Sequence, residues 1–146
     1  MLQIHKILAP VEFDDLIDDV ARTAVQFASL FKATVCFLHV DDPLSGAPSL
    51  VAGSLHTARH SGDELRERIL EFVPAEFLSS VSASYHTVTG DPVEEIVRFS
   101  KKNDIDLIIL GNSVKSAFAR LFFTSVEEAL IHKAPCHVLT VVEKKR

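Results

Sequence analysis

Histidine and cysteine are the residues of this chain with the widest chemistry, because both types bind metals and take part in catalysis. His56 and His60 lie four residues apart, a spacing that would place both rings on one face of a helix, as a metal pair requires. Metal sites in proteins need three or four ligands, and no third ligand lies at motif distance. The spacing therefore favours two solvated histidines on a helix edge over a metal site.

The two cysteines of the chain lie in apolar, strand-like runs. Cys36 and Cys136 are one hundred residues apart, so neither a short metal motif nor a disulfide framework is visible. We interpret both as buried structural thiols, since free cysteine usually behaves as a small buried hydrophobe. His39 and His86 fall inside predicted strands, and no serine or cysteine stands out as a nucleophile that either could activate as a base. We interpret them as structural histidines.

Three motifs that would indicate an enzyme are missing from the sequence. It has no G-x-x-x-x-G-K-[ST] phosphate loop, no G-x-G-x-x-G dinucleotide motif and no G-x-S-x-G nucleophile elbow. We therefore predict that the protein is not an enzyme, and we assign neither a catalytic residue nor a metal ligand.

Composition predicts one globular domain over residues 1–146, with 47% hydrophobic and 24% charged positions. The net charge of −5 has the wrong sign for binding nucleic acid or anionic lipid. Apolar runs are far shorter than the roughly 20 residues that cross a bilayer, and the apolar stretch at the N-terminus is too short for a signal peptide. We expect a cytoplasmic protein that binds neither nucleic acid nor membrane.

Strand and helix patterns alternate along the chain. Periodicity predicts strands over residues 5–11, 34–40, 81–88, 105–110 and 138–142, and helices over residues 14–32, 57–72, 92–103 and 125–132. An irregular stretch covers residues 42–55 and a connector covers residues 112–123. Such alternation implies crossover connections, so the predicted fold is α/β: a Rossmann-like, five-stranded, mostly parallel sheet with helices on both faces. Residues 81–88 read as an edge strand and residues 105–110 as a central one.

Five segments, in order along the chain, together resemble the universal stress protein family: KILAPVEF, FLHVDDP, GDPVEEIV, DLIILGNS and KAPCHVLTV. The resemblance covers the whole chain and implies the same Rossmann-like domain. Members commonly pair as homodimers through the last strand, which implies a dimer contact over residues 138–142.

The family has one branch that binds ATP and one that does not, separated by the motif G-x2-G-x9-G-[ST]. Gly111 and Ser125 match its first and last positions, whereas Val114 and Thr124 stand at the second and third glycines. Valine and threonine resist the positive φ that a backbone wrapped closely around phosphates requires. The chain therefore resembles the branch that lacks the full ATP-binding motif.

Two functions follow from this resemblance. The first is a non-enzymatic stress-response or regulatory domain, acting as a homodimer and through an unidentified protein partner, without tight ATP binding and without a cofactor. The alternative is a binder of ATP with magnesium, or of another adenine nucleotide, with at most slow hydrolysis. Its candidate nucleotide site, which includes a glutamate where the binding branch usually has aspartate, comprises Pro10, Val11, Glu12, Val40, Gly111, Ser125 and Val126.

Overall fold

The computed structural model describes residues 1–13, 17–43, 60–112 and 126–142. Its centre is a five-stranded sheet in the order β3-β2-β1-β4-β5, and every neighbouring pair runs parallel. The strands are β1 (Lys6–Pro10), β2 (Thr34–Asp41), β3 (Ser82–Thr89), β4 (Leu107–Asn112) and β5 (His137–Val142). The predicted parallel α/β fold is confirmed, as are the edge position of the third strand and the interior position of the fourth.

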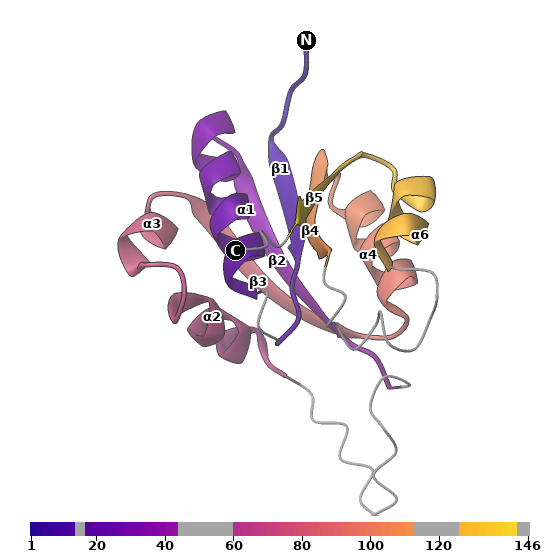
Figure 1. Cartoon of the computed structure of the whole chain (residues 1–146), viewed down its shortest axis with the longest axis horizontal. Helices are drawn as coiled ribbons and strands as arrows, with labels where there is room; N and C mark the ends of the chain where they lie inside the picture. The colour runs from indigo at the N-terminus through magenta and orange to yellow at the C-terminus, as the bar shows by residue number, and fades with distance from the viewer. Residues whose placement is uncertain (14–16, 44–59, 113–125, 143–146) are drawn as a thin grey trace, which may run out of the picture.

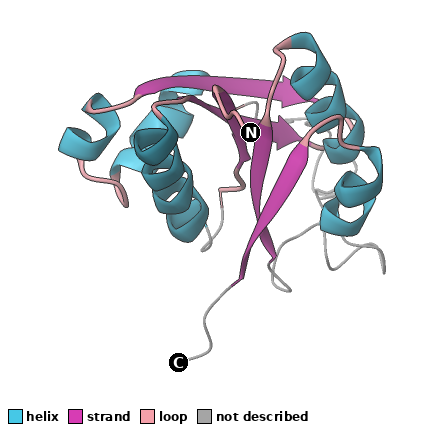
Figure 2. Cartoon of the chain, turned by 90° about the horizontal axis from the view of Figure 1, so that it is seen from above, coloured by secondary structure: helices cyan, strands magenta, loops and turns pink. Residues whose placement is uncertain are grey.

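Helices cover both faces of this sheet. They are α1 (Ile17–Phe31), α2 (Gly62–Leu70), α3 (Ala75–Ser79), α4 (Pro92–Lys102) and α6 (Val126–Lys133). Figure 1 shows α1, α2 and α3 on one side of the sheet and α4 and α6 on the other, and Figure 2 shows the same layers from above. None of the described helices is both long and apolar enough to span a membrane.

The two hydrophobic cores follow from the alternation of side chains along the strands. In β2, Val35 and Phe37 are buried in the core that α1 and α2 cover. Cys36, Leu38 and Val40 are buried in the core on the opposite face. Because helices cover both faces, β2 reads in the sequence as an unbroken apolar run.

The predicted helix over residues 57–72 differs from the structure at its described part. The helix α2 begins at Gly62 and ends at Leu70, and Pro74 precedes a further short helix, α3, that the periodicity did not reveal. The start of α2 is set by a capping box, in which Ser61 Oγ accepts the Glu64 N–H at 3.1 Å. A serine three residues before a glutamate, followed by the apolar Leu65, is a stronger boundary signal than the periodicity that predicts an earlier start.

The predicted start of α4 is confirmed. Asp91 is its N-cap and accepts the Glu94 N–H at 3.0 Å, and Pro92 occupies the first helical turn. Most of the predicted irregular stretch and of the connector after β4 lies outside the described residues.

Candidate functional site

The carboxyl ends of β1 and β2 lie side by side, at the edge of the sheet where open parallel sheets bind ligands. The Val11 N–H donates to the Leu38 carbonyl at 2.9 Å, so backbone pairing continues one residue beyond β1. This brings Pro10, Val11 and Glu12 next to Val40, as the candidate nucleotide site requires. The side chains of Val11 and Val40 are buried.

The other residues of the predicted nucleotide site are less closely gathered. Gly111 lies near the carboxyl end of β4, which pairs in parallel with β1 on the side opposite β2, so it lies at the same edge of the sheet. Val126 is the first residue of α6 and packs against the core between α4, α6 and the sheet. Ser125 lies outside the described residues, as do Val114 and Thr124, so their place in a site stays a prediction.

His39 connects the two strand ends. Its Nδ1 lies 2.9 Å from the Val11 carbonyl oxygen, and its Nε2 lies 3.0 Å from Asp41 Oδ1. His39 and Asp41 are two residues apart in β2, so they project on the same face of the sheet, the one covered by α1, α2 and α3. Because a carbonyl oxygen can only accept, His39 Nδ1 carries a proton and donates it to Val11.

His60 approaches the same carboxylate from the other side. Its Nδ1 lies 2.9 Å from Asp41 Oδ1, and its backbone N–H donates to Asp41 Oδ2 at 3.2 Å. His60 precedes the N-cap Ser61 and lies outside α2. The prediction that placed it on a helix edge is therefore wrong, and its predicted neighbour, His56, lies outside the described residues.

Phe13 closes the group from the side of β1. Its ring is stacked on the His60 ring, with centroids 4.1 Å apart and an interplanar angle of 18°. It meets the His39 ring edge to face, with centroids 4.7 Å apart. We name Phe13, His39, Asp41 and His60 the strand-end cluster.

Three side chains of the strand-end cluster offer atoms that can bind a cation. His39 Nε2, Asp41 Oδ1 and His60 Nδ1 all lie within 4.8 Å of one another. Their side chains are 10%, 16% and 34% exposed, so the group is sheltered by β2 and opens toward solvent at His60. The signal in the sequence was His39 and Asp41 two residues apart, because a strand places two such polar groups on one face. His60, the third ligand residue, is distant in sequence and follows a segment whose sequence has no periodic pattern.

His86, in β3, and Cys136, just before β5, are not part of a comparable cluster of described residues. His86 Nε2 lies 2.9 Å from Ser84 Oγ, and burial lowers the pKa of the His86 ring. Burial and the negative charge of Asp106 raise the pKa of the Cys136 thiol to about 11, so this thiol is protonated and unreactive near neutral pH. Cys36 is buried, as predicted, whereas Cys136 is only half-buried.

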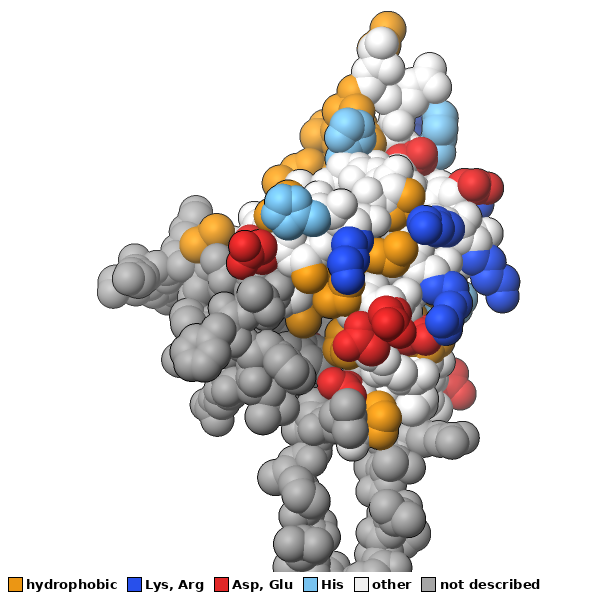
Figure 3. Space-filling view, turned by 90° about the vertical axis from the view of Figure 1, so that its right-hand side faces the viewer, with side chains coloured by type: hydrophobic (Ala, Val, Ile, Leu, Met, Phe, Trp, Pro, Cys, Tyr) orange, Lys and Arg blue, Asp and Glu red, His pale blue; other side chains and the backbone are white. Residues whose placement is uncertain are grey.

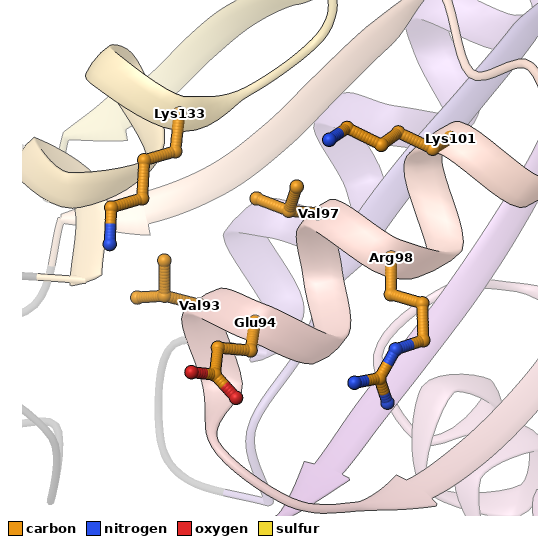
Figure 4. Close-up of a pocket in the computed structure, with 6 residues that line it drawn as sticks. All are labelled: Val93, Glu94, Val97, Arg98, Lys101 and Lys133. Carbon is orange, nitrogen blue, oxygen red and sulfur yellow. The ribbon is translucent and has the colours of Figure 1, made fainter.

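A shallow groove of about 520 Å³ lies on the opposite face of the molecule, between α4 and α6 (Figure 4). It is lined by Val93, Glu94, Val97, Arg98, Lys101 and Lys133. Lysine and arginine side chains gather over this face, with carboxylates beside them (Figure 3). The lining has no histidine, cysteine or hydroxyl group, so the strand-end cluster is the stronger candidate for site chemistry.

Comparisons with known proteins agree with this architecture. The model of the universal stress protein family matches residues 3–142. A universal stress protein of Methanocaldococcus jannaschii is 29% identical over 97% of this chain and 84% of its own length. A second universal stress protein of the same archaeon is 27% identical over 95% of both chains.

Solved structures share the fold. The universal stress protein UspA from Lactobacillus plantarum has a TM-score of 0.68 and 23% identity, covering 95% of this chain and 98% of its own. A universal stress protein in complex with cAMP has a TM-score of 0.66 and 17% identity, over 96% and 98% of the two chains. A third, from Archaeoglobus fulgidus in complex with dAMP, has a TM-score of 0.57 and 20% identity, over 96% and 98%. Since the family model spans nearly the whole chain, the protein belongs to the universal stress protein family.

Proposed function

We propose that this chain is a non-enzymatic regulatory domain of the stress response, which acts as a homodimer and through protein contacts and does not bind ATP tightly. The observation that carries the proposal is the engagement of Val11 at the strand ends. Its N–H is bonded to Leu38 and its carbonyl accepts from His39. The Val11 N–H could donate to a nucleobase only after its bond to Leu38 was broken. The His39 ring already occupies one side of the Val11 carbonyl, which leaves less room for a base there.

Aromatic rings add to this obstruction. Phe13 packs against both His39 and His60 beside Val11, so the space next to the candidate nucleoside residues is occupied by the protein's own side chains. A nucleoside would have to displace Phe13 from two ring contacts before it could stack there.

The phosphate side also argues against tight ATP binding. Two motif glycines are replaced, by Val114 and Thr124. The first turn of α6 carries Glu127 and Glu128, whose charges offset the positive helix end that would attract phosphate.

Dimerisation through β5 is supported by the strand's position. β5 is an edge strand paired only with β4 among the described strands, so one of its sides presents unpaired backbone groups. Its central residues are half-buried and Val142 is 63% exposed. An apolar edge of this kind is suited to pairing with a second copy.

Binding of an adenine nucleotide is the second candidate. The solved structures described above as complexes with cAMP and dAMP have the same fold. In this chain Pro10, Val11, Glu12 and Val40 meet at the edge where open parallel sheets bind ligands. In this case the nucleoside would replace Phe13 at the strand ends, with at most slow hydrolysis of ATP.

Calorimetric titration with ATP and magnesium, beside AMP and adenosine, tests the proposal. We expect no heat and no thermal shift at millimolar ATP. Micromolar binding of ATP would contradict it, whereas binding of AMP or adenosine alone would support the second candidate. The double variant Val114→Gly with Thr124→Gly is the matched control, because a gain of ATP binding there would attribute the loss to the missing glycines.

A further inference from the structure

We propose that the strand-end cluster binds one divalent first-row transition ion of the zinc type, through His39 Nε2, Asp41 Oδ1 and His60 Nδ1. This proposal goes beyond the regulatory function and stands whether or not the protein binds ATP. Each of its ligands lies among the described residues.

The first argument is an electron-pair conflict at His39. Its Nδ1 donates a proton to the Val11 carbonyl at 2.9 Å, so Nε2 is the ring nitrogen whose lone pair can bind a metal ion. That lone pair faces Asp41 Oδ1 at 3.0 Å, and an ionised carboxylate oxygen is also only an acceptor. Two acceptors at this distance, in a largely buried place, need a cation or an extra proton between them.

The second argument is the orientation of the Asp41 carboxylate. Its Oδ2 accepts the His60 backbone N–H at 3.2 Å, which turns Oδ1 toward both imidazole rings. Oδ1 then lies 2.9 Å from His60 Nδ1 and 3.0 Å from His39 Nε2. One carboxylate oxygen therefore stands between two ring nitrogens, each able to supply a lone pair to the same ion.

The spacing of the three atoms suits a tetrahedral centre. Bonds of roughly 2.0 to 2.2 Å to zinc place neighbouring ligand atoms roughly 3.3 Å apart in tetrahedral geometry. The observed nitrogen–oxygen separations of 2.9 and 3.0 Å need only a slight widening. The two ring nitrogens lie within 4.8 Å of each other, and binding an ion would draw them closer together.

The surroundings of the ligands have the features of a metal site. Ligating histidines usually donate their second ring N–H to a carbonyl or carboxylate, which fixes the tautomer, and His39 does so toward Val11. Phe13 stacks on His60 and fixes the plane of that ring. His60 is 34% exposed, so the fourth position is open to water or to an exogenous ligand, as in zinc sites with three protein ligands.

The donor set selects the class of ion. Two imidazoles and one carboxylate suit zinc and its first-row neighbours, whereas magnesium and calcium prefer oxygen ligands throughout. Zinc, cobalt(II) and magnesium are therefore the three probes.

The test uses the full chain after treatment with a chelator. We expect calorimetry, supported by competition with a chromophoric chelator, to show one equivalent of zinc bound, and millimolar magnesium to leave that binding unchanged. Cobalt(II) should give the intense visible absorption of a four-coordinate site. In Asp41→Asn and in His60→Gln, zinc affinity should fall by roughly 100-fold or more, beyond the usual effect of losing an outer-shell partner.

His86→Gln is the matched control, because it removes a strand histidine that lies outside the cluster, and it should bind zinc as the wild type does. Circular dichroism of each variant confirms that it is folded. If Asp41→Asn does not fold, the cobalt spectrum of the wild type and its loss in His60→Gln decide the question.

Two results would overturn the proposal. Zinc binding of equal affinity in the wild type, Asp41→Asn and His60→Gln would place the ion elsewhere on the protein. An absence of zinc binding by the wild type would mean that a proton, and not a metal, lies between His39 and Asp41.

Discussion

His39 Nδ1 lies 2.9 Å from the carbonyl oxygen of Val11, a residue 28 positions earlier in the chain. The contact joins the end of β2 to the segment that follows β1. It also fixes the ring so that Nε2 faces Asp41. His39 therefore contacts a backbone carbonyl of the candidate nucleotide site, and it also supplies one of the three proposed metal ligands.

Replacing His39 by phenylalanine should destabilise the fold. The ring volume is similar, but the Val11 carbonyl loses its donor and Asp41 loses one partner in a buried place. We expect a loss of about 1 to 3 kcal/mol in the free energy of unfolding, measured by urea denaturation. His86→Phe, which removes one contact with Ser84, should lose less, and equal losses would contradict a special role for His39.

Charge on the edge of β5 should disrupt the proposed dimer. The double variant Thr140→Lys with Val142→Lys would place two positive charges on each of the paired edge strands, close to those of the second copy, where like charges are unfavourable. We expect at least about a tenfold weaker dimer by light scattering over a dilution series. Thr89→Lys, at the exposed end of the opposite edge strand β3, is the control and should leave the dimer intact. A monomeric wild type would refute the dimer itself.

Shortening a side chain of α6 to alanine should lower the free energy of unfolding only where that side chain faces the core. Leu130 is fully buried, whereas its neighbour Ile131 is 58% exposed. Leu130→Ala should cost about 2 to 5 kcal/mol of unfolding free energy, because it removes buried methyl groups and leaves a cavity. Ile131→Ala should change it by less than about 0.5 kcal/mol. A large loss in Ile131→Ala would instead indicate that this residue is covered in an assembly.

Cys136 should react slowly with thiol reagents. Its pKa of about 11 means that the thiolate is scarce at pH 8 and becomes abundant only as the pH approaches that value. We expect the rate with Ellman's reagent to rise with pH between 8 and 10, without a plateau, in the folded protein. Cys136→Ser, which leaves the buried Cys36, should show almost no reaction, and a rate plateau near pH 8.5 in the wild type would contradict the raised pKa.

The fold could be predicted well because its signals are local. Apolar runs such as the one over β2 report burial on both faces, and the cap formed by Asp91 and Pro92 reports the start of α4. The start of α2 at Ser61 was also written in the sequence, as a serine followed three residues later by glutamate. The periodic pattern alone predicts a start near residue 57, which is earlier than the observed start at Gly62.

The strand-end cluster could be predicted only in part. His39 and Asp41 share a strand, so their common face follows from the period of two. Their contact with His60 depends on how the chain returns to the sheet after β2, and the hydrogen bond to Val11 depends on the register of β1 against β2. Neither is encoded in a short spacing, because both arise from tertiary packing.

A long-range proton–nitrogen correlation spectrum of the histidine rings, recorded before and after one equivalent of zinc, tests the role of His39 most directly. We predict a protonated Nδ1 on His39 in both spectra, and an Nε2 signal that moves to the position of a metal-bound nitrogen when zinc is added. A His39 ring protonated at Nε2 alone, or one unchanged by zinc, would contradict the arrangement in which Val11 holds His39 toward Asp41.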